Sequence, residues 1–505
     1  MTREPFSEHG AQPTVEAPCA PASRTASTPG SRTARMAVIV SHGMGEQVPF
    51  ETLNAVAEAL WKQQSTAPMD ASNARVRYVA FGDDWLPRVE LKLDTPGGSE
   101  CTVHLYEVYW APLTEGKVTA RDAIGFLVGA GLRGIRYCAR GSFDRWMFGR
   151  RVVFALPRRG VVQLGAALIA FLALLLGFLG VAMATVAEIV RFLHPGATPP
   201  PPSWLPDLRD AWMLAALAAS LVVFAALRWF LVQSVGDVAA YVSAHRASRF
   251  VEIRRAIQDA ARGVARNVYA ARDGESGAPQ YAHVMMVGHS LGSVIAYDML
   301  NDSINGDLAA TAGAGPFLDV VRRTKLLLTL GSPLDKTAFL FRTQKDDAPL
   351  REALAAAAQP MIVSYENRPA RWINIWSPND WICGSLEYYD ATQPGDIPPG
   401  TNTSTVDVLS AVGRPDASAI DVSDQIAASG NAAPASRFQS RAVENVRERD
   451  VPLDTVRAHL GYWKRPALGE RLYAAIVEAD AAGAVRAGDA RLPALENGGR
   501  SGIVN

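Results

Sequence analysis

The sequence of 505 residues predicts an α/β fold built on a mostly parallel sheet. Three features support this. A strand-like apolar run, 284–287, passes through a glycine-flanked serine into a helical run, 294–300. A second apolar strand, 36–40, leads into a His-Gly loop, and a third, 372–376, ends in a Pro-Asn-Asp turn. Strands that alternate with helical patterns are typical of parallel sheets.

The most specific motif is the pentapeptide Gly288-His289-Ser290-Leu291-Gly292. A serine between a strand and a helix stands on a sharp turn with its hydroxyl exposed above the sheet. The flanking glycines suit such a turn because side chains there would clash with the strained backbone. Without that setting, the motif would indicate only an ordinary glycine-rich turn. Ser290 is therefore the candidate nucleophile.

A serine hydroxyl needs a base to take its proton, and the base is usually a histidine oriented by a carboxylate. The turn resembles that of the α/β-hydrolase superfamily, and this resemblance implies that the acid and then the histidine follow the serine in the chain. Of the eight histidines, only His459 follows His289. His459 is therefore the predicted base, in a loop before the C-terminal helical run 469–487.

The acid is expected after a late strand. Residues 372–376 are β-branched and aromatic, and the turn 377–380 follows them. Asp380 is therefore the predicted acid, and its plainer alternative is a turn-capping role. Asp335, which follows the strand 326–330, is the competing candidate.

An oxyanion hole needs two backbone N–H donors aimed at the developing negative charge. Leu291, directly after the candidate nucleophile, is the first predicted donor. The second is expected in a loop after an early strand, and Met44 occupies that place. His42 and Gly43 precede it, and we expect His42 to support this loop rather than act as the base.

The order of these features resembles the α/β-hydrolase superfamily, in its lipase-like branch. The chain is similar to bacterial membrane-associated lipase-like proteins and, more distantly, to GPI inositol-deacylase-type lipases. The residues that carry the resemblance are Val38–Glu46, Glu107–Ala111, Gly236-Asp237, Val287–Tyr297, Thr329–Leu334, Asp380–Gly384 and Ala458–Trp463. The resemblance implies hydrolysis of carboxylic esters through an acyl-enzyme.

The remaining elements follow from periodicity. Residues 51–63 place apolar side chains at helical spacing. The runs 76–81, 89–93 and 103–109 alternate as strands do. Helical spacing continues from Val238 to Val268 and predicts one long helix.

A transmembrane hairpin is predicted at 160–235, inserted into the fold. Residues 160–187 contain no charged residue and are long enough to span a bilayer, although a buried core helix is the alternative for such a run. The second span, 211–235, is interrupted by Arg228 near one end, where this side chain can snorkel to the head groups.

Basic residues set the predicted orientation. The basic residues on the first flank are Arg133, Arg136, Arg140, Arg145, Arg150, Arg151, Arg158 and Arg159. Those on the second flank are Arg228, Arg246, Arg249, Arg254 and Arg255, whereas the connector has only Arg191 and Arg209. Both flanks, both termini and the catalytic domain are therefore predicted to be cytoplasmic, on a bacterial inner membrane. The basic segment 113–159 is predicted to be an amphipathic approach to the bilayer, with a solvated basic surface as the alternative.

The predicted organisation is one hydrolase domain in two parts, 36–112 and 236–490, around the hairpin. The ends, 1–35 and 491–505, are expected to be disordered tails. Within the second part, residues 411–440 are polar and rich in Ala and Ser, and they are interpreted as either a lid or an insertion.

Composition excludes several function classes. Fifty basic residues balance fifty acidic ones, so the charge gives no reason to expect a nucleic acid partner. The four cysteines lack metal spacing, and no metal or other cofactor is expected. The expected partners are the lipid bilayer and a lipid or acyl-ester substrate. The competing hypotheses are a catalytically inactive membrane interaction protein with the same fold and a transporter or channel component.

Overall fold

The computed structural model describes residues 35–129, 236–337, 358–390, 441–448 and 455–489, apart from gaps at 46, 71–72, 83, 97–99, 120, 127–128, 243–247, 275, 312, 314, 364 and 381, together with isolated positions between 176 and 225. The predicted tails, the segment 411–440 and most of 113–235 lie outside these residues. The residues predicted to form the site, Met44, Ser290, Leu291, Asp380 and His459, are all among the described ones.

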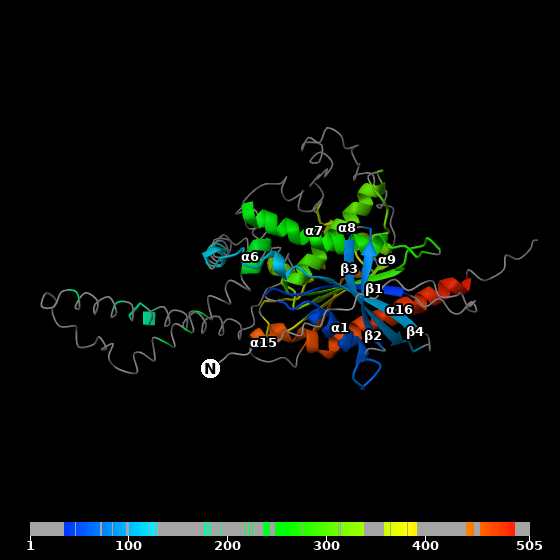
Figure 1. Ribbon diagram of the computed structural model, residues 1–505, viewed down its shortest axis with the longest axis horizontal. Helices are drawn as coiled ribbons and strands as arrows, with labels where there is room; N and C mark the ends of the chain where they lie inside the picture. Colours follow the sequence, from blue (N-terminus) through cyan, green and yellow to red (C-terminus); the bar gives the residue numbers. More distant parts are fainter. Residues whose placement is uncertain are drawn as a thin grey trace, which may run out of the picture. The chain divides into compact units, whose positions relative to one another are not determined.

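One eight-stranded sheet organises the described residues, in the order β2-β3-β4-β1-β5-β6-β7-β8 (Figure 1). The strands are β1 (Arg35–Ser41), β2 (Ala74–Phe81), β3 (Asp84–Asp94), β4 (Glu100–Val108), β5 (His283–His289), β6 (Thr324–Leu330), β7 (Arg371–Trp376) and β8 (Val443–Arg447). From β4 to β8 every neighbouring pair is parallel, and β3 is antiparallel to β2 and β4. The predicted mostly parallel α/β architecture is confirmed.

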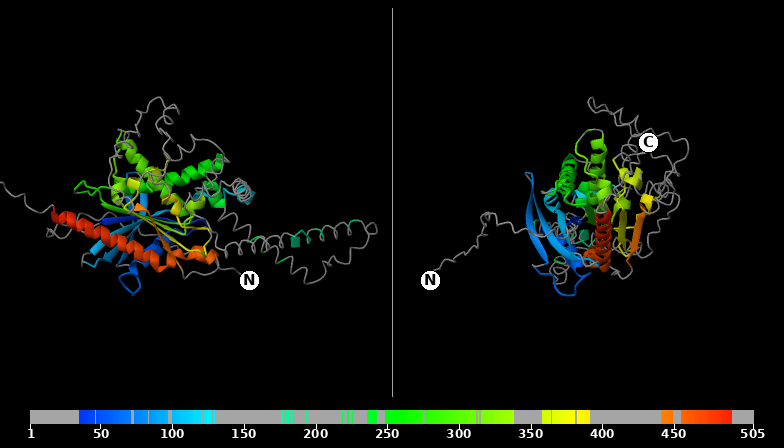
Figure 2. Two further views of the ribbon diagram at one scale, coloured as in Figure 1. Left: turned by 180° about the vertical axis from the view of Figure 1, so that it is seen from behind. Right: turned by 90° about the vertical axis from the view of Figure 1, so that its right-hand side faces the viewer.

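Helices cover both faces of this sheet. The α-helices are α1 (Glu51–Trp61), α6 (Gly236–Val242), α7 (Ser248–Ala270), α8 (Leu291–Thr311), α9 (Val320–Arg323), α12 (Pro360–Val363), α15 (Thr455–Leu460) and α16 (Pro466–Asp489), and the 3-10 helices are η1 (Ala111–Leu113), η4 (Tyr365–Asn367), η5 (Glu387–Asp390) and η8 (Gly461–Lys464). α7 and α8 lie on one face, and α1 and α16 lie on the other (Figure 2). The sheet is thus the middle layer of three.

The central position of β1 explains why its sequence is apolar throughout, because both faces of the strand are buried. Successive side chains of a strand point to opposite faces. Ala37 and Ile39 pack into the core beneath α7 and α8, whereas Met36, Val38 and Val40 pack into the core beneath α1 and α16. A strand that is buried on both faces carries a continuous apolar run rather than an alternating one.

The chain leaves β1 and β5 in opposite directions. From β1 it passes through α1 to β2 at one edge, whereas from β5 it passes through α8 to β6 on the other side. Such a reversal opens a crevice at the carboxyl ends of the two strands, where ligands bind in open α/β sheets. The loop after Ser41 and the turn at Ser290 both lie at this position.

Most predicted elements are confirmed to within a few residues. The long helix predicted over 238–268 corresponds to two helices, α6 and α7, and the residues between them are outside the described set. Strand β8 was not predicted. Within the described part of the chain no helix combines the length and hydropathy needed to cross a bilayer, and all but isolated positions of the predicted spans 160–187 and 211–235 fall outside it.

Candidate active site

Ser290 occupies the turn between β5 and α8. Its φ of 52° lies in the left-handed region, which costs a non-glycine residue on the order of 1–2 kcal/mol. Two backbone hydrogen bonds hold this conformation: Ser290 N–H donates to the Leu330 carbonyl, and Ser293 N–H donates to the Ser290 carbonyl, both at 2.9 Å. The strained strand-to-helix turn predicted from the pentapeptide is therefore present.

The loop after β1 lies directly against this turn. A Cβ atom on Gly292 would lie 2.1 Å from the His42 carbonyl oxygen, so only glycine permits this approach. A Cβ atom on Gly43 would lie 3.3 Å from the Cβ atom of Ser290. The two glycines thus bring the His42–Met44 loop and the serine into contact.

Three predicted site residues meet at this edge of the sheet. His459 Nε2 lies 2.7 Å from Ser290 Oγ, and His459 Nδ1 lies 2.8 Å from Asp380 Oδ2. All three are buried, with exposed fractions of 1% for Ser290 and Asp380 and 3% for His459. The chain separations are 169 and 79 residues, so the fold alone brings them together.

The surroundings of His459 differ from the prediction in one respect. It lies in the short helix α15 rather than in a loop. Asp454 and Thr455 are residue types that favour a helix N-terminus, and no glycine or proline interrupts 455–460. These local signals favour a helical turn, and the loop prediction was wrong.

Asp380 is arranged to remain ionised. Burial by itself raises its pKa, but the hydrogen bond and charge interaction with His459, with further hydrogen bonds from Cys383 and the Ile382 N–H, hold the pKa of this carboxyl below its ordinary value. An ionised Asp380 accepts a hydrogen bond from His459 Nδ1–H, and this tautomer leaves Nε2 free to accept a proton from Ser290.

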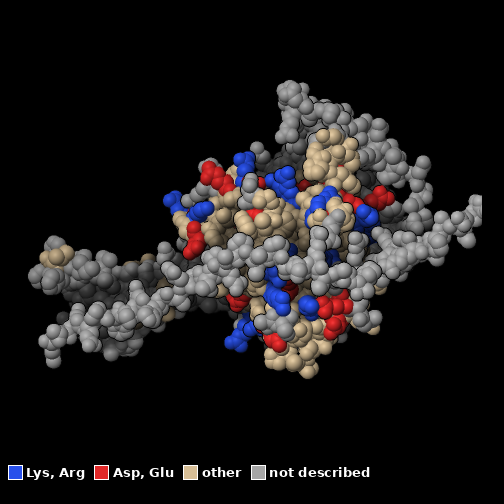
Figure 3. Space-filling model, turned by 45° about the vertical axis from the view of Figure 1, so that its right-hand side comes forward, with Lys and Arg blue, Asp and Glu red and all other residues tan. Residues whose placement is uncertain are grey.

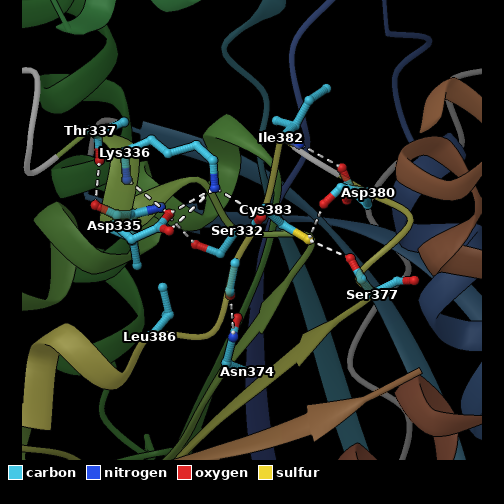
Figure 4. Close-up of polar contacts among 12 residues, drawn as sticks. Ser332, Asp335, Lys336, Thr337, Asn374, Ser377, Asp380, Ile382, Cys383 and Leu386 are labelled. Atoms are coloured by element: carbon cyan, nitrogen blue, oxygen red, sulfur yellow. Dashed lines mark hydrogen bonds and ion pairs between the residues drawn. The ribbon is translucent and has the colours of Figure 1, made fainter. Parts of the chain in front are cut away.

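The competing acid, Asp335, has different partners. Its carboxylate accepts the Lys336 N–H at 2.8 Å and pairs with Lys336 Nζ at 3.2 Å, and the same Nζ donates to the Cys383 carbonyl. Figure 4 shows Asp335 and Asp380 on opposite sides of Cys383. Of the two candidates, Asp380 is the one that contacts the histidine.

The two predicted oxyanion donors belong to the two segments that meet at Ser290. Leu291 is the first residue of α8, and the N–H groups of a first helical turn have no acceptor within the helix. Met44 follows Gly43 in the loop that touches the serine. On the other side of Met44, Gly45 N–H donates to Asp237 Oδ2 at 2.9 Å.

His42 contacts the end of β4 through its ring. Its Nε2 accepts the Trp110 N–H at 3.1 Å, its Nδ1 donates to the Gly43 carbonyl at 2.8 Å, and the ring stacks on the Trp110 indole at 4.8 Å. Because one ring nitrogen accepts a hydrogen bond and the other donates one, the imidazole of His42 is neutral. Burial accordingly lowers the pKa of His42 to about 4, although its bond to Gly43 opposes that change.

His289 is a positioning residue that the sequence did not reveal. Its Nε2 donates to the backbone carbonyl of His459 at 2.8 Å, and its ring lies 5.0 Å from the His459 ring and 5.4 Å from Trp463. Burial, with a smaller contribution from His459, lowers the pKa of His289 to about 3. The second position of the pentapeptide gives no signal for this contact.

Replacing His289 by glutamine is expected to reduce the pH dependence of stability. Below pH 6.5 the unfolded chain binds a proton on His289 that the native protein does not bind until about pH 3, so acid favours unfolding. The wild type should therefore lose about 2 kcal/mol more unfolding free energy than the variant between pH 7 and pH 5. Denaturant titrations at both pH values measure this difference, and equal losses would contradict it.

On the face drawn in Figure 3, the acidic and basic side chains of the described residues are interspersed. The described side chains on that face therefore supply no single-sign field that would steer a strongly charged partner. Among the described residues, no group of three His, Cys, Asp or Glu side chains is placed to hold a metal ion. Comparisons of the chain with protein-family models, curated proteins and solved structures found no match.

Proposed function

We propose that this protein is a membrane-anchored serine hydrolase of the α/β-hydrolase type that cleaves carboxylic esters. The observation that supports it best is the hydrogen-bonded path from Ser290 Oγ through His459 to Asp380, with steps of 2.7 Å and 2.8 Å. A strained serine, a histidine and a buried carboxylate in this geometry are the parts that nucleophilic acyl transfer needs.

The proposed mechanism has two steps. Ser290 Oγ attacks the ester carbonyl while His459 Nε2 takes the hydroxyl proton, and His459 then passes that proton to the departing alcohol as the acyl–oxygen bond breaks. Asp380 stabilises the imidazolium, and the N–H groups of Met44 and Leu291 stabilise the oxyanion. Water then attacks the acyl-enzyme, His459 takes its proton, and the carboxylic acid leaves as Ser290 recovers its hydrogen.

The substrate class follows from the predicted anchor. If 160–187 and 211–235 form a transmembrane hairpin, the active site stays close to the lipid surface, and lipid or long acyl esters are the nearest substrates. Hydrolysis of esters with short and long acyl chains, measured in detergent and in vesicles, tests this part of the proposal. A uniform preference for short, water-soluble esters would contradict it.

A fluorescent fluorophosphonate probe tests the central proposal. The probe reacts with a serine hydroxyl that a base has activated, with loss of fluoride. We expect the detergent-purified wild type to be labelled and the Ser290→Ala variant to remain unlabelled, with circular dichroism showing that both are folded. Absence of labelling in the folded wild type would favour the inactive interaction protein. Equal labelling of both proteins would show that Ser290 is not the nucleophile.

A further inference from the structure

The loop that carries Met44 is held between the two ends of the predicted insertion. Before the insertion, Trp110 N–H donates to His42 Nε2 at 3.1 Å, and the Trp110 indole N–H donates to the His42 carbonyl at 3.2 Å. After the insertion, Asp237 accepts the Gly45 N–H at 2.9 Å across 192 positions of the chain. Segments on both sides of the insertion therefore meet at the candidate oxyanion loop.

Asp237 is buried, and burying a charged carboxylate costs free energy. It is 5% exposed and lies in the first turn of α6. Burial raises the pKa of Asp237 to about 6, while hydrogen bonds from Gly45 N–H and the Thr114 side chain lower it. A buried carboxylate is tolerated when its oxygens accept hydrogen bonds, and here one of those donors is a backbone group next to Met44.

The planarity of the peptide units explains what the hydrogen bond from Gly45 N–H to Asp237 controls. A peptide unit is planar and trans, so fixing its carbonyl also fixes the direction of its N–H. The unit that contains the Met44 N–H is held through the Gly43 carbonyl, which accepts His42 Nδ1–H at 2.8 Å. The next unit, between Met44 and Gly45, is held by Asp237, and Gly45 keeps a left-handed φ of 93°. Met44 is thus fixed from both sides.

We propose that Asp237 is a positioning residue that holds the Met44 N–H in the direction a developing oxyanion requires. This inference rests on the proposed function. Removing the carboxylate leaves the Gly45 N–H without this acceptor and frees the Met44–Gly45 unit to turn, so that only the His42 bond to the Gly43 carbonyl still restrains the Met44 N–H. The loss should affect the transition state more than the bound substrate, because the donor is aimed at charge that develops only during reaction.

Asp237→Ala is expected to lower kcat for ester hydrolysis by about 10- to 100-fold, a part of the loss seen when one oxyanion donor is removed, while KM changes little. Asp237→Asn keeps an acceptor oxygen and should return kcat to within about threefold of the wild type. If Asp237→Ala does not fold, Asp237→Leu is the second variant. Leucine fills a volume similar to that of aspartate without a hydrogen-bond acceptor, and the variant should show the same loss of kcat.

Asp307 offers a matched control. It is also buried, and its two oxygens accept the Leu318 N–H at 2.7 Å and the Val320 N–H at 2.6 Å, near the other end of α8. Asp307→Ala removes two such backbone contacts, so it should lower thermal stability and leave kcat unchanged.

The experiment measures kcat and KM of the full-length wild type and variants with one chromogenic ester, and Ser290→Ala defines the background. A wild type that does not exceed this background overturns the proposed function and the inference together. An active wild type with an Asp237→Ala kcat within threefold overturns the inference alone. An Asp237→Asn variant as slow as Asp237→Ala also overturns it, because the acceptor oxygen would then not be what matters.

Discussion

Replacing His459 by alanine is expected to lower kcat for ester hydrolysis on the order of a million-fold, because a serine without its base is barely nucleophilic. His459 Nε2 lies 2.7 Å from Ser290 Oγ and provides the path for the serine proton. The buried His289 and His42 already hydrogen-bond to carbonyl oxygens and are not placed to substitute for it. Turnover of a chromogenic ester and labelling by the fluorophosphonate probe both measure the loss.

His104 provides the control for this variant. It is a buried histidine whose Nδ1 lies 2.8 Å from the Tyr281 hydroxyl, on β4 and away from Ser290. His104→Gln should leave kcat within a few-fold of the wild type. A His459→Ala variant that keeps turnover within tenfold of the wild type would show that another group takes the serine proton.

Asp380→Asn is expected to lower kcat on the order of ten thousand-fold. The amide has nearly the same shape as the carboxylate, so the fold should persist. Its NH2 group can donate to His459 Nδ1, and this favours the tautomer in which Nε2 carries the proton and cannot accept another from Ser290. The amide also lacks the negative charge that stabilises the imidazolium. Steady-state kinetics at neutral pH measure the effect.

Asp335→Asn is the matched comparison for this prediction. It makes the same chemical change in a buried carboxylate that lies near Cys383 and pairs with Lys336. Its kcat should stay within a few-fold of the wild type. A larger loss for Asp335→Asn than for Asp380→Asn would reverse the assignment of the acid.

The sequence predicted those parts of the fold whose burial is strong and regular. Strand β1 is buried on both faces and reads as an unbroken apolar run, and β7 is nearly as clear. Strand β8, Val443–Arg447, lies at the edge of the sheet, and Glu444 within it pairs with Arg371 and Arg471. A polar edge strand lacks the apolar pattern on which strand prediction depends.

The three residues of the proposed triad could be found because chain order constrained them. Only one histidine follows the pentapeptide that contains Ser290, and Asp380 lies in the turn directly after a clear strand. The residues that contact the backbone around the site could not be found in this way. His289 donates to the backbone carbonyl of His459, and Asp237 accepts the backbone N–H of Gly45 in the Met44 loop. Such contacts leave no spacing rule in the sequence. Gly236-Asp237 contributes to the family resemblance, yet nothing in that pair indicates its contact with Gly45.

The position of β1 in the sheet also constrains how the protein folds. Met36 pairs with Val103 of β4 on one side and with His283 of β5 on the other. During synthesis β1 and β4 are complete long before β5 emerges, so the nascent sheet has an open edge at its future centre. Such edges can pair with other chains, and distant pairings form slowly. The first part of the domain therefore has no complete core of its own and depends on the second part to become a stable fold.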